Sequence, residues 1–367
     1  MNRLKYMGGI ALLLIVISCD REDPMIQSLR EPFIPEVPAH VERPTIPESN
    51  PLTQAKVNLG KKLFFDPILS KDFSVSCASC HDPSAGFSDV RRVSLGVEGK
   101  SGFLPEERRN AMALMNLTNQ RFLFWDGAVS AEDGAYDELE IQALKPILND
   151  FEMDNTLEEV NRRLKESEEY VDLFDIAFED TVKDIYIARA LASFERTLLS
   201  YGSKYDLYFE RGLDSTVFTD QEWRGFKVYF DEKEGVDHAE CFHCHGGPEL
   251  NDLSQIFRNN GLPITPANPN FDPGTSQVPG LTGFGVAFKV PTLRNISFTA
   301  PYMHDGRFAS LDEVLDFYQK GVDKNGPDTD RLMRTVGFSD EEKEDLKAFL
   351  LTFNDTAFIN NPNLRPD

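Results

Sequence analysis

The stretch Cys77-Ala78-Ser79-Cys80-His81 decides the interpretation of this chain. It is a C-x-x-C-H pentad, the pattern at which c-type haem is attached. Two thiols at this spacing can each add to a vinyl group of one porphyrin, and the histidine that follows is then held under the iron. The pattern returns at Cys241-Phe242-His243-Cys244-His245. The sequence therefore predicts two covalent c-type haems, with His81 and His245 as iron ligands.

Two other kinds of site also use paired cysteines. A zinc site of four cysteines has its two pairs about 15–20 residues apart, whereas these pentads lie in different halves of the chain. A thioredoxin-like motif needs a βαβ setting, and no such pattern surrounds either pentad in the sequence. Both alternatives are weaker than haem attachment.

The composition limits the class of protein and its partners. With 367 residues, of which 41% are hydrophobic, the chain is long enough for two domains with separate cores. Its formal net charge of −23 argues against nucleic acid and against an anionic membrane surface as partners. An acidic surface would suit a basic protein partner, although a solvated acidic surface is the commoner meaning.

The N-terminus has the pattern of an export signal. Arg3 and Lys5 precede the apolar run at residues 10–17, which is too short to span a bilayer. The run ends at Ser18-Cys19, which resembles a lipoprotein cleavage site; the alternative is a plain signal peptide and a chance cysteine. We expect a periplasmic or cell-envelope protein whose lipid anchor on Cys19 is its only contact with the membrane.

The segments that precede the two pentads repeat. Residues 60–66 read GKKLFFD and residues 225–231 read GFKVYFD. Thr219 and Glu222 form the pattern of a capping box, which predicts the start of a helix. A repeated helix, loop and pentad predicts an all-α protein of two tandem cytochrome c-like domains.

The expected organisation runs from an exported leader to a short tail. It comprises a lipoprotein signal peptide at 1–18, an extended tether at 19–51 with seven prolines, a first haem domain at 52–215, a second at 216–355 and a tail at 356–367. Helical spacing recurs at 157–164, 170–178, 185–199 and 339–353. Residues 259–291 are rich in Gly and Pro and predict a long loop, and no run of strands is expected.

Further motifs make the chain resemble a known family. In order they are Arg109-Asn110, Phe124-Trp125-Asp126-Gly127, Gln142-Ala143, Glu152-Met153, Phe194-Glu195-Arg196-Thr197, FKVPTLRN at 288–295 and PYMHDG at 301–306. In order and spacing, across roughly residues 50 to 355, they resemble the bacterial dihaem cytochrome c peroxidase family, which includes the MauG-type enzymes.

The resemblance implies a role for each haem. The first haem would split peroxide and the second would transfer electrons, with Trp125 between them as a relay. Glu152 would stand over the open face of the first haem. Asn110 and the carbonyl oxygens of Thr299 and Pro301 would hold a calcium ion at the domain interface, as hard oxygen ligands do.

Some positions depart from the usual peroxidase pattern. Val97 stands where many peroxidases have a histidine that caps the resting first haem. Tyr318 stands where they have the methionine ligand of the second haem, and tyrosine is the MauG-like choice. Ala128 and the stretch 111–113 also differ from the pattern, which affects local loop geometry and not the haems.

The chemistry of the first site can also be argued from the residues. Peroxide chemistry needs an iron with a free position, and no other histidine lies between His40 and His238 than His81. Possible sulfur ligands, or else core residues, are Met112, Met115 and Met153. Cleavage of peroxide needs a group that moves a proton, which a carboxylate can do when burial raises its pKa. Glu152 is the candidate, and Trp125 is either an electron relay or an ordinary core aromatic.

For the second iron the sequence offers four candidates opposite His245, namely Met303, His304, Tyr318 and Met333. A phenolate favours more oxidised iron than a thioether does, because hard anionic oxygen stabilises the higher charge. We expect Tyr318 to be the ligand; the alternative is that it only packs there.

We therefore expect a peroxidase that reduces hydrogen peroxide to water with electrons from a small cytochrome c or cupredoxin. One alternative is a MauG-like oxidase that uses peroxide to oxidise a protein or organic substrate, which Tyr318 favours. Another is a dihaem electron carrier without catalysis. No nucleic-acid partner is expected, and a homodimer is among the assemblies considered.

Overall fold

The computed structural model describes residues 23–100, 109–129, 137–230, 239–252, 254, 256–262 and 271–366. This part of the chain is mainly helical, as predicted. The α-helices are α1 Pro24–Arg30, α2 Gln54–Phe65, α3 Glu138–Leu148, α4 Leu157–Glu166, α5 Glu168–Phe178, α6 Asp184–Glu195, α7 Lys204–Glu210, α8 Asp220–Tyr229, α9 Leu311–Asp316, α10 Asp340–Leu350 and α11 Thr356–Ile359. Strands β1 Phe257–Arg258 and β2 Phe288–Lys289 pair antiparallel. Short 3₁₀ turns and loops join these elements.

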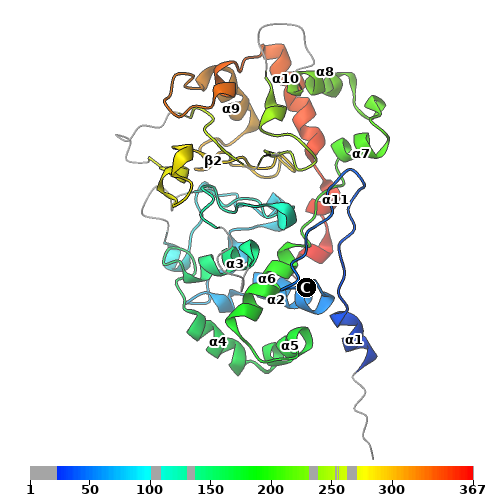
Figure 1. The fold of residues 1–367 in the computed structure, drawn as a ribbon, viewed down its shortest axis with the longest axis vertical. Helices are drawn as coiled ribbons and strands as arrows, with labels where there is room; N and C mark the ends of the chain where they lie inside the picture. Colours follow the sequence, from blue (N-terminus) through cyan, green and yellow to red (C-terminus); the bar gives the residue numbers. More distant parts are fainter. Residues whose placement is uncertain are drawn as a thin grey trace, which may run out of the picture.

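The buried apolar side chains form two large cores, and Figure 1 shows the two groups of helices that surround them. The first core lies among α2 to α6, where Phe64 and Phe194 pack with ring centroids 5.2 Å apart. The second lies among α7, α8 and α10, where Phe349 packs against Phe226 and Phe353. Two separate cores are what two tandem domains require, because each unit must bury its own apolar faces.

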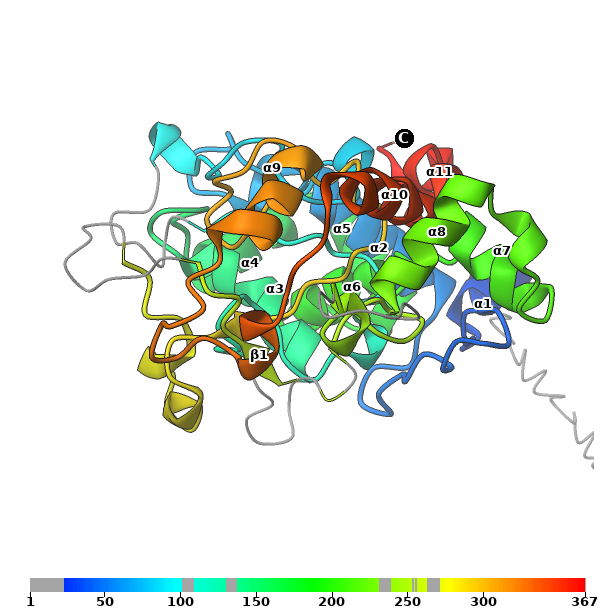
Figure 2. The same ribbon diagram turned by 90° about the horizontal axis from the view of Figure 1, so that it is seen from above.

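The same helix crossing occurs in each core. Helix α2 packs on α6, and α8 packs on α10 (Figures 1 and 2). A Cβ atom at Gly60 would lie 1.9 Å from the carbonyl oxygen of Ala190, and one at Gly225 would lie 2.0 Å from that of Asp345. Only a residue without a side chain permits this approach. The repeated glycine in the sequence therefore marks the contact that aligns each pentad's leading helix with its partner helix.

The segment predicted to be an extended tether, 19–51, contains a helix and packs against the protein where the structure describes it. Helix α1 packs against α2 and α5, and Arg30 Nε donates to the Ile176 carbonyl oxygen at 2.7 Å. Farther along, Val41 is buried, and His40 Nε2 lies 3.1 Å from Asp206 Oδ1. The prolines keep much of this segment extended, but these contacts hold it against the protein. The predicted signal peptide and Cys19 lie outside the described residues.

The two domain boundaries also differ from the prediction. Helix α7 contributes Tyr205 and Tyr208 to the second core, so that domain begins before residue 216. The predicted tail, 356–367, instead returns to the first core with Phe358, Ile359 and Leu364. The apolar spacing of these short segments is too brief to show from sequence which core they join.

None of the described helices is both long enough and apolar enough to cross a membrane.

Candidate haem sites

The first pentad forms a tight turn. Cys77–Ser79 is a 3₁₀ turn, and the N–H groups of Cys80 and His81 donate to the Cys77 carbonyl at 3.1 and 3.0 Å. His81 Nδ1 lies 2.9 Å from the Phe87 carbonyl oxygen. Because a carbonyl oxygen only accepts, Nδ1 carries the proton and Nε2 is left as the ligand atom. This is the usual arrangement of a metal-binding histidine.

The second pentad repeats this geometry. Cys241–His243 is again a 3₁₀ turn, and His245 Nδ1 lies 3.1 Å from the Pro291 carbonyl oxygen and 3.3 Å from that of Leu250. Burial lowers the pKa of both imidazoles, and that of His245 to about 4. Both rings are therefore neutral near pH 7, which is the form that binds a metal.

A cavity of about 1310 Å³, its open mouth included, adjoins the second pentad. Its walls contain Cys241, Cys244 and His245, and most of its other lining side chains are apolar, among them Leu311, Val314, Leu315, Val336 and Leu350. A large apolar hollow with a histidine whose Nε2 is available suits a porphyrin. The residues present therefore fit a covalently attached haem.

The first pentad has buried carboxyl groups beside it. Burial raises the pKa of the Cys77 thiol, and the carboxylates of Glu195 and Glu152 raise it further, so both acids lie near this turn. Glu195 Oε2 on α6 is buried without a hydrogen-bond partner among the described residues, as is Gln142 Oε1 on α3. Burial raises the pKa of Glu195 to about 8. Unpartnered buried oxygens are rare in proteins, and a cofactor's polar edge would account for them.

Glu152, the predicted proton-transfer group, follows the end of α3. Its Oε1 accepts from Asn149 Nδ2 at 3.0 Å, and its backbone carbonyl accepts from Val97 N–H at 2.8 Å. Burial raises the pKa of Glu152 to about 7, although the hydrogen bond from Asn149 opposes the shift. A carboxyl group with this pKa changes its protonation state near neutral pH, as a proton carrier must.

The other potential ligands of the first iron are held in other contacts. His40 is paired with Asp206 and stacks on Phe209 with ring centroids 5.1 Å apart. Met115 Sδ accepts from Asn295 Nδ2 at 3.2 Å. Met153 is buried in the first core. Met112 lines the interdomain cavity, and a free coordination position opposite His81 stays a prediction.

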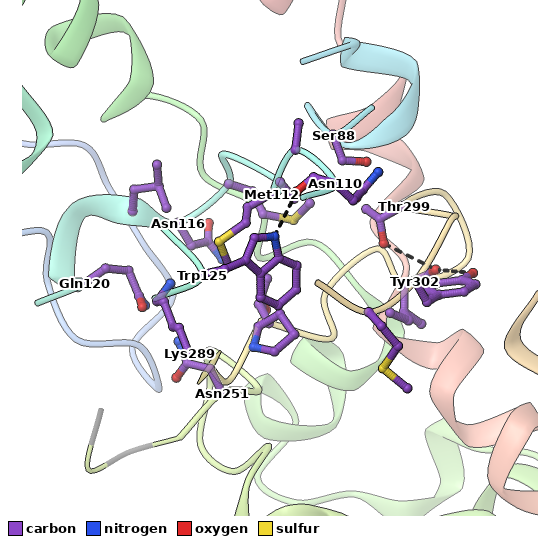
Figure 3. A pocket seen from close by; sticks show the side chains of 18 of the residues that line it. Ser88, Asn110, Met112, Asn116, Gln120, Trp125, Asn251, Lys289, Thr299 and Tyr302 are labelled. Atoms are coloured by element: carbon purple, nitrogen blue, oxygen red, sulfur yellow. Dashed lines mark hydrogen bonds between the residues drawn. The ribbon is translucent and has the colours of Figure 1, made fainter. Parts of the chain in front are cut away.

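Trp125 lies in a cavity between the two domains (Figure 3). Its Nε1–H donates to the Asn110 carbonyl oxygen at 2.8 Å, and its own carbonyl accepts from Lys289 N–H at 2.7 Å. The indole lines this interdomain cavity and also the cavity of the second pentad. The structure therefore brings Trp125 to the second predicted haem site and fixes its orientation from both sides.

The three predicted calcium ligands line the same interdomain cavity. Asn110, Thr299 and Pro301 contribute to its wall. The Asn110 side-chain N–H groups donate to the carbonyl oxygens of Asp89 and Arg91 at 3.2 and 2.9 Å, which leaves Oδ1 as its possible ligand atom. The described residues hold no cluster of three His, Cys, Asp or Glu side chains for a metal. Any cation here would depend on amide, carbonyl and water oxygens.

All four candidates for the second iron line the cavity of the second pentad, together with His245. Tyr318 lies in a π-helical turn, Phe317–Gly321, that continues α9. Its Oη accepts from Asn260 Nδ2 at 3.2 Å, and the same amide group lies 3.6 Å from Met303 Sδ. Burial raises the pKa of Tyr318 to about 12, although the hydrogen bond from Asn260 lowers it.

Another candidate, His304, is held against the cavity wall. Its ring stacks on Phe288 with ring centroids 3.9 Å apart, and its Nε2 lies 4.0 Å from Asp272 Oδ2. Sequence reasoning missed Asn260 and Lys289. Lys289 lies inside a quoted motif, but no signal in the sequence indicates that it lines both cavities.

Two pentads with neutral histidines, and an apolar cavity beside the second, are the features expected of a c-type cytochrome with two haem sites. Residues 54–214 match the family model of di-haem cytochrome c peroxidase. The methylamine utilization protein MauG of Methylorubrum extorquens is 38% identical over 321 residues, which cover 87% of this chain and 84% of that protein. The cytochrome c551 peroxidase of Nitrosomonas europaea is 34% identical over 259 residues, covering 70% and 71%.

A solved structure of a MauG-like protein associated with microbial copper homeostasis is also similar. It is 30% identical, with a TM-score of 0.76, and the match covers 90% of this chain and 98% of that one. The chain belongs to the dihaem cytochrome c peroxidase and MauG family, which confirms the resemblance that the motifs predicted. It is an oxidoreductase of a family that carries two c-type haems.

Proposed function

We propose that this protein is an exported peroxidase that reduces hydrogen peroxide to water at its first haem. The observation that carries the proposal is Glu152, a partly buried carboxyl group near Cys77 whose pKa is raised to about 7. Relatives named cytochrome c peroxidase support the same activity. Hydrogen peroxide takes up two electrons and two protons to give two molecules of water.

The chain's own residues supply the proton path and the orientation. When bound, the haem would supply an iron that binds peroxide and gives it electrons. Ionised Glu152 can accept a proton from one peroxide oxygen and return it to the other, which then leaves as water. Asn149 holds that carboxyl group through its amide. Val97 adds no ionisable side chain beside Glu152, and Glu195 is the other carboxyl group near this pentad.

The second haem would receive electrons from a small cytochrome c or cupredoxin. We propose that Trp125 relays them and that Tyr318 binds the second iron opposite His245. Asn110, with carbonyl oxygens of Thr299 and Pro301, would hold a calcium ion that ties the two domains together. Lipidation at Cys19 would keep the protein at the cell envelope, where a soluble donor can reach it.

The test is to add hydrogen peroxide to the resting ferric protein and to follow optical and EPR spectra. We expect immediate reaction without prior reduction, and catalytic consumption of peroxide when a reduced small cytochrome c is supplied. A resting protein in which both haems are six-coordinate and inert to peroxide would contradict the proposal and favour an electron carrier.

The second candidate function is oxidation of a protein or organic substrate by the equivalents of peroxide. It is favoured by Tyr318 in the cavity of the second pentad and by the 38% identity to a MauG protein. A protein that reacts with peroxide, but turns over poorly with every reduced cytochrome or cupredoxin, would support this candidate against the first.

A further inference from the structure

A half-buried lysine lies between the two predicted haem sites. Lys289 is on β2, opposite Phe257, and its backbone N–H donates to the Trp125 carbonyl. It lines the cavity of the second pentad and the interdomain cavity. Figure 3 shows Lys289 beside the indole of Trp125, with Asn110 on the other side of the ring in this view. The residue thus stands at the junction of the two cavities.

No described carboxylate neutralises this lysine. Burial alone lowers the pKa of Lys289 to about 8, with no neighbouring charge that opposes the shift. Arg258 is the other basic residue that lines the cavity of the second pentad, and unlike Lys289 it has carboxylate partners. Its guanidinium group pairs with Asp252 at 2.8 Å and with Asp330 at 2.9 Å. Arg258 is therefore compensated within the protein, whereas Lys289 faces the cavity without a counterion from the described chain.

A cation held between apolar walls without an anion is strongly unfavourable. A methionine or leucine would line this largely apolar cavity without that penalty. The lysine is therefore best explained by an anion that enters with the ligand of the cavity. A haem carries two propionate carboxylates, and they are the only anionic groups on its edge.

We propose that Lys289 binds a propionate of the second haem and holds a positive charge between that haem and Trp125. This inference rests on the proposed function, because it requires the second haem in this cavity. A fixed cation favours the reduced haem, which carries one more electron than the oxidised haem. Lys289 is thus a positioning residue that raises the reduction potential of the second haem.

The experiment measures the midpoint potential of each haem in the purified two-haem protein by spectroelectrochemical titration. In Lys289→Met we expect the reduction equilibrium of the second haem to shift about tenfold toward ferric. That shift equals a fall of about 59 mV for a one-electron couple. Lys289→Arg should retain the wild-type potential, because it keeps the charge.

The matched control is Lys320→Met. It removes the same charge from the second domain, but Lys320 is 69% exposed and its partner Asp340 is 87% exposed, so water and salt screen it. Its potentials should equal those of the wild type. Resonance Raman spectra give a second readout, because the propionate bending band of the second haem should shift in Lys289→Met and not in the control.

An unchanged second-haem potential in Lys289→Met, or a shift confined to the first haem, would overturn the inference. If this variant binds fewer than two haems, Lys289→Gln is measured in the same way and decides the matter. The potentials can be titrated whether or not the protein consumes peroxide. Failure of the inference and failure of the proposed peroxidase activity are therefore separate results.

Discussion

The two halves of this molecule share a scaffold and differ in what surrounds the haem sites. Each half has a helix crossing closed by a glycine, Gly60 or Gly225, and a pentad whose histidine donates Nδ1–H to a carbonyl oxygen. These features would attach a haem and orient its proximal histidine. Because both halves share them, they do not distinguish the roles of the two haems.

The surroundings of the two sites separate their roles. The first pentad has the carboxyl groups of Glu152 and Glu195 nearby. The second has a largely apolar cavity with a phenol, two thioethers and an uncompensated lysine among its lining groups. Acids near an accessible iron suit proton transfer, whereas a cavity rich in potential ligands suits an iron that only exchanges electrons. This difference supports our proposal that peroxide reacts in the first half.

The largest expected effect is loss of a whole haem. Replacing Cys77 and Cys80 together by serine should leave one haem per chain and abolish peroxide consumption, because attachment at the first site needs both thiols. The pyridine haemochrome assay and the peroxide assay measure these outcomes. The matched variant, with Cys241 and Cys244 replaced, should also hold one haem but still react with peroxide once. If only the variant without Cys77 and Cys80 still reacted with peroxide, the peroxide site would belong to the second half.

The next largest effect is expected at Glu152, the proposed proton carrier. Glu152→Gln should retain both haem spectra and slow the reaction with peroxide by about 10²–10⁴-fold, the usual contribution of a positioned acid–base group. Stopped-flow measurement of the ferric protein gives the rate. The control is Asp150→Asn, which removes an exposed acid from the same turn and should leave the rate unchanged.

The pH dependence follows from the same group. Glu152 acts as a base in its ionised form, and its pKa is about 7. The rate of the peroxide reaction should therefore fall as the pH drops through 7 and level off above it. Glu152→Gln should lose this dependence. A wild-type rate that is flat from pH 6 to 8, a window of about one unit on either side of that pKa, would show that another group moves the proton.

A smaller effect, on stability, is expected at the two helix crossings, and it tests whether they are equivalent. Alanine at Gly60 or at Gly225 would place Cβ about 2 Å from a backbone carbonyl oxygen. Each substitution should reduce the free energy of unfolding by about 1–3 kcal/mol, as overpacking does. Gly283→Ala is the control, because nothing lies within 4 Å of its Cβ position. The free energy of unfolding is measured by denaturant titration of the two-haem protein. If only one of the two alanine substitutions lowered it, the two helix crossings would not be equivalent.

The sequence predicted the parts of this structure that depend on local pattern. Three patterns require particular residues at fixed spacing: the pentads, the repeated glycine segment and the capping box at Thr219. In the structure the second pentad forms a turn, the glycines lie at helix crossings, and Thr219 caps α8. The order of the motifs predicted the family. Glu152 was found only because its motif marked one acid among many.

The rest depends on contacts between distant segments. Residues 19–51 were expected to be an extended tether because they are rich in proline, but Arg30 bonds to Ile176, far along the chain, and Val41 is buried. Phe358 reaches the first core from the far end of the sequence. Lys289 lacks a described counterion only because of where β2 lies. Spacing along one segment cannot show which distant segment it meets.

The smallest effect on peroxide chemistry is expected at Tyr318. Its Oη lies in the cavity of the second pentad with one hydrogen bond, from Asn260. Burial holds the pKa of the phenol at about 12, so the group is neutral until a positive centre favours its anion. We predict that it binds the second iron as phenolate, which Tyr318→Phe would prevent.

Because the first site contains the proton carrier, Tyr318→Phe should leave the initial reaction of the ferric protein with peroxide unchanged. The second haem should change its EPR signal, and Tyr318→Met should raise its potential, since a thioether favours ferrous iron. Met303 and Met333 line the same cavity and offer the competing ligand. A wild-type ferric spectrum with the near-infrared band of histidine–methionine ligation would show that one of them binds instead. The second half would then be an ordinary electron-transfer site, and the second candidate function, a MauG-like reaction, would lose the structural observation that favours it.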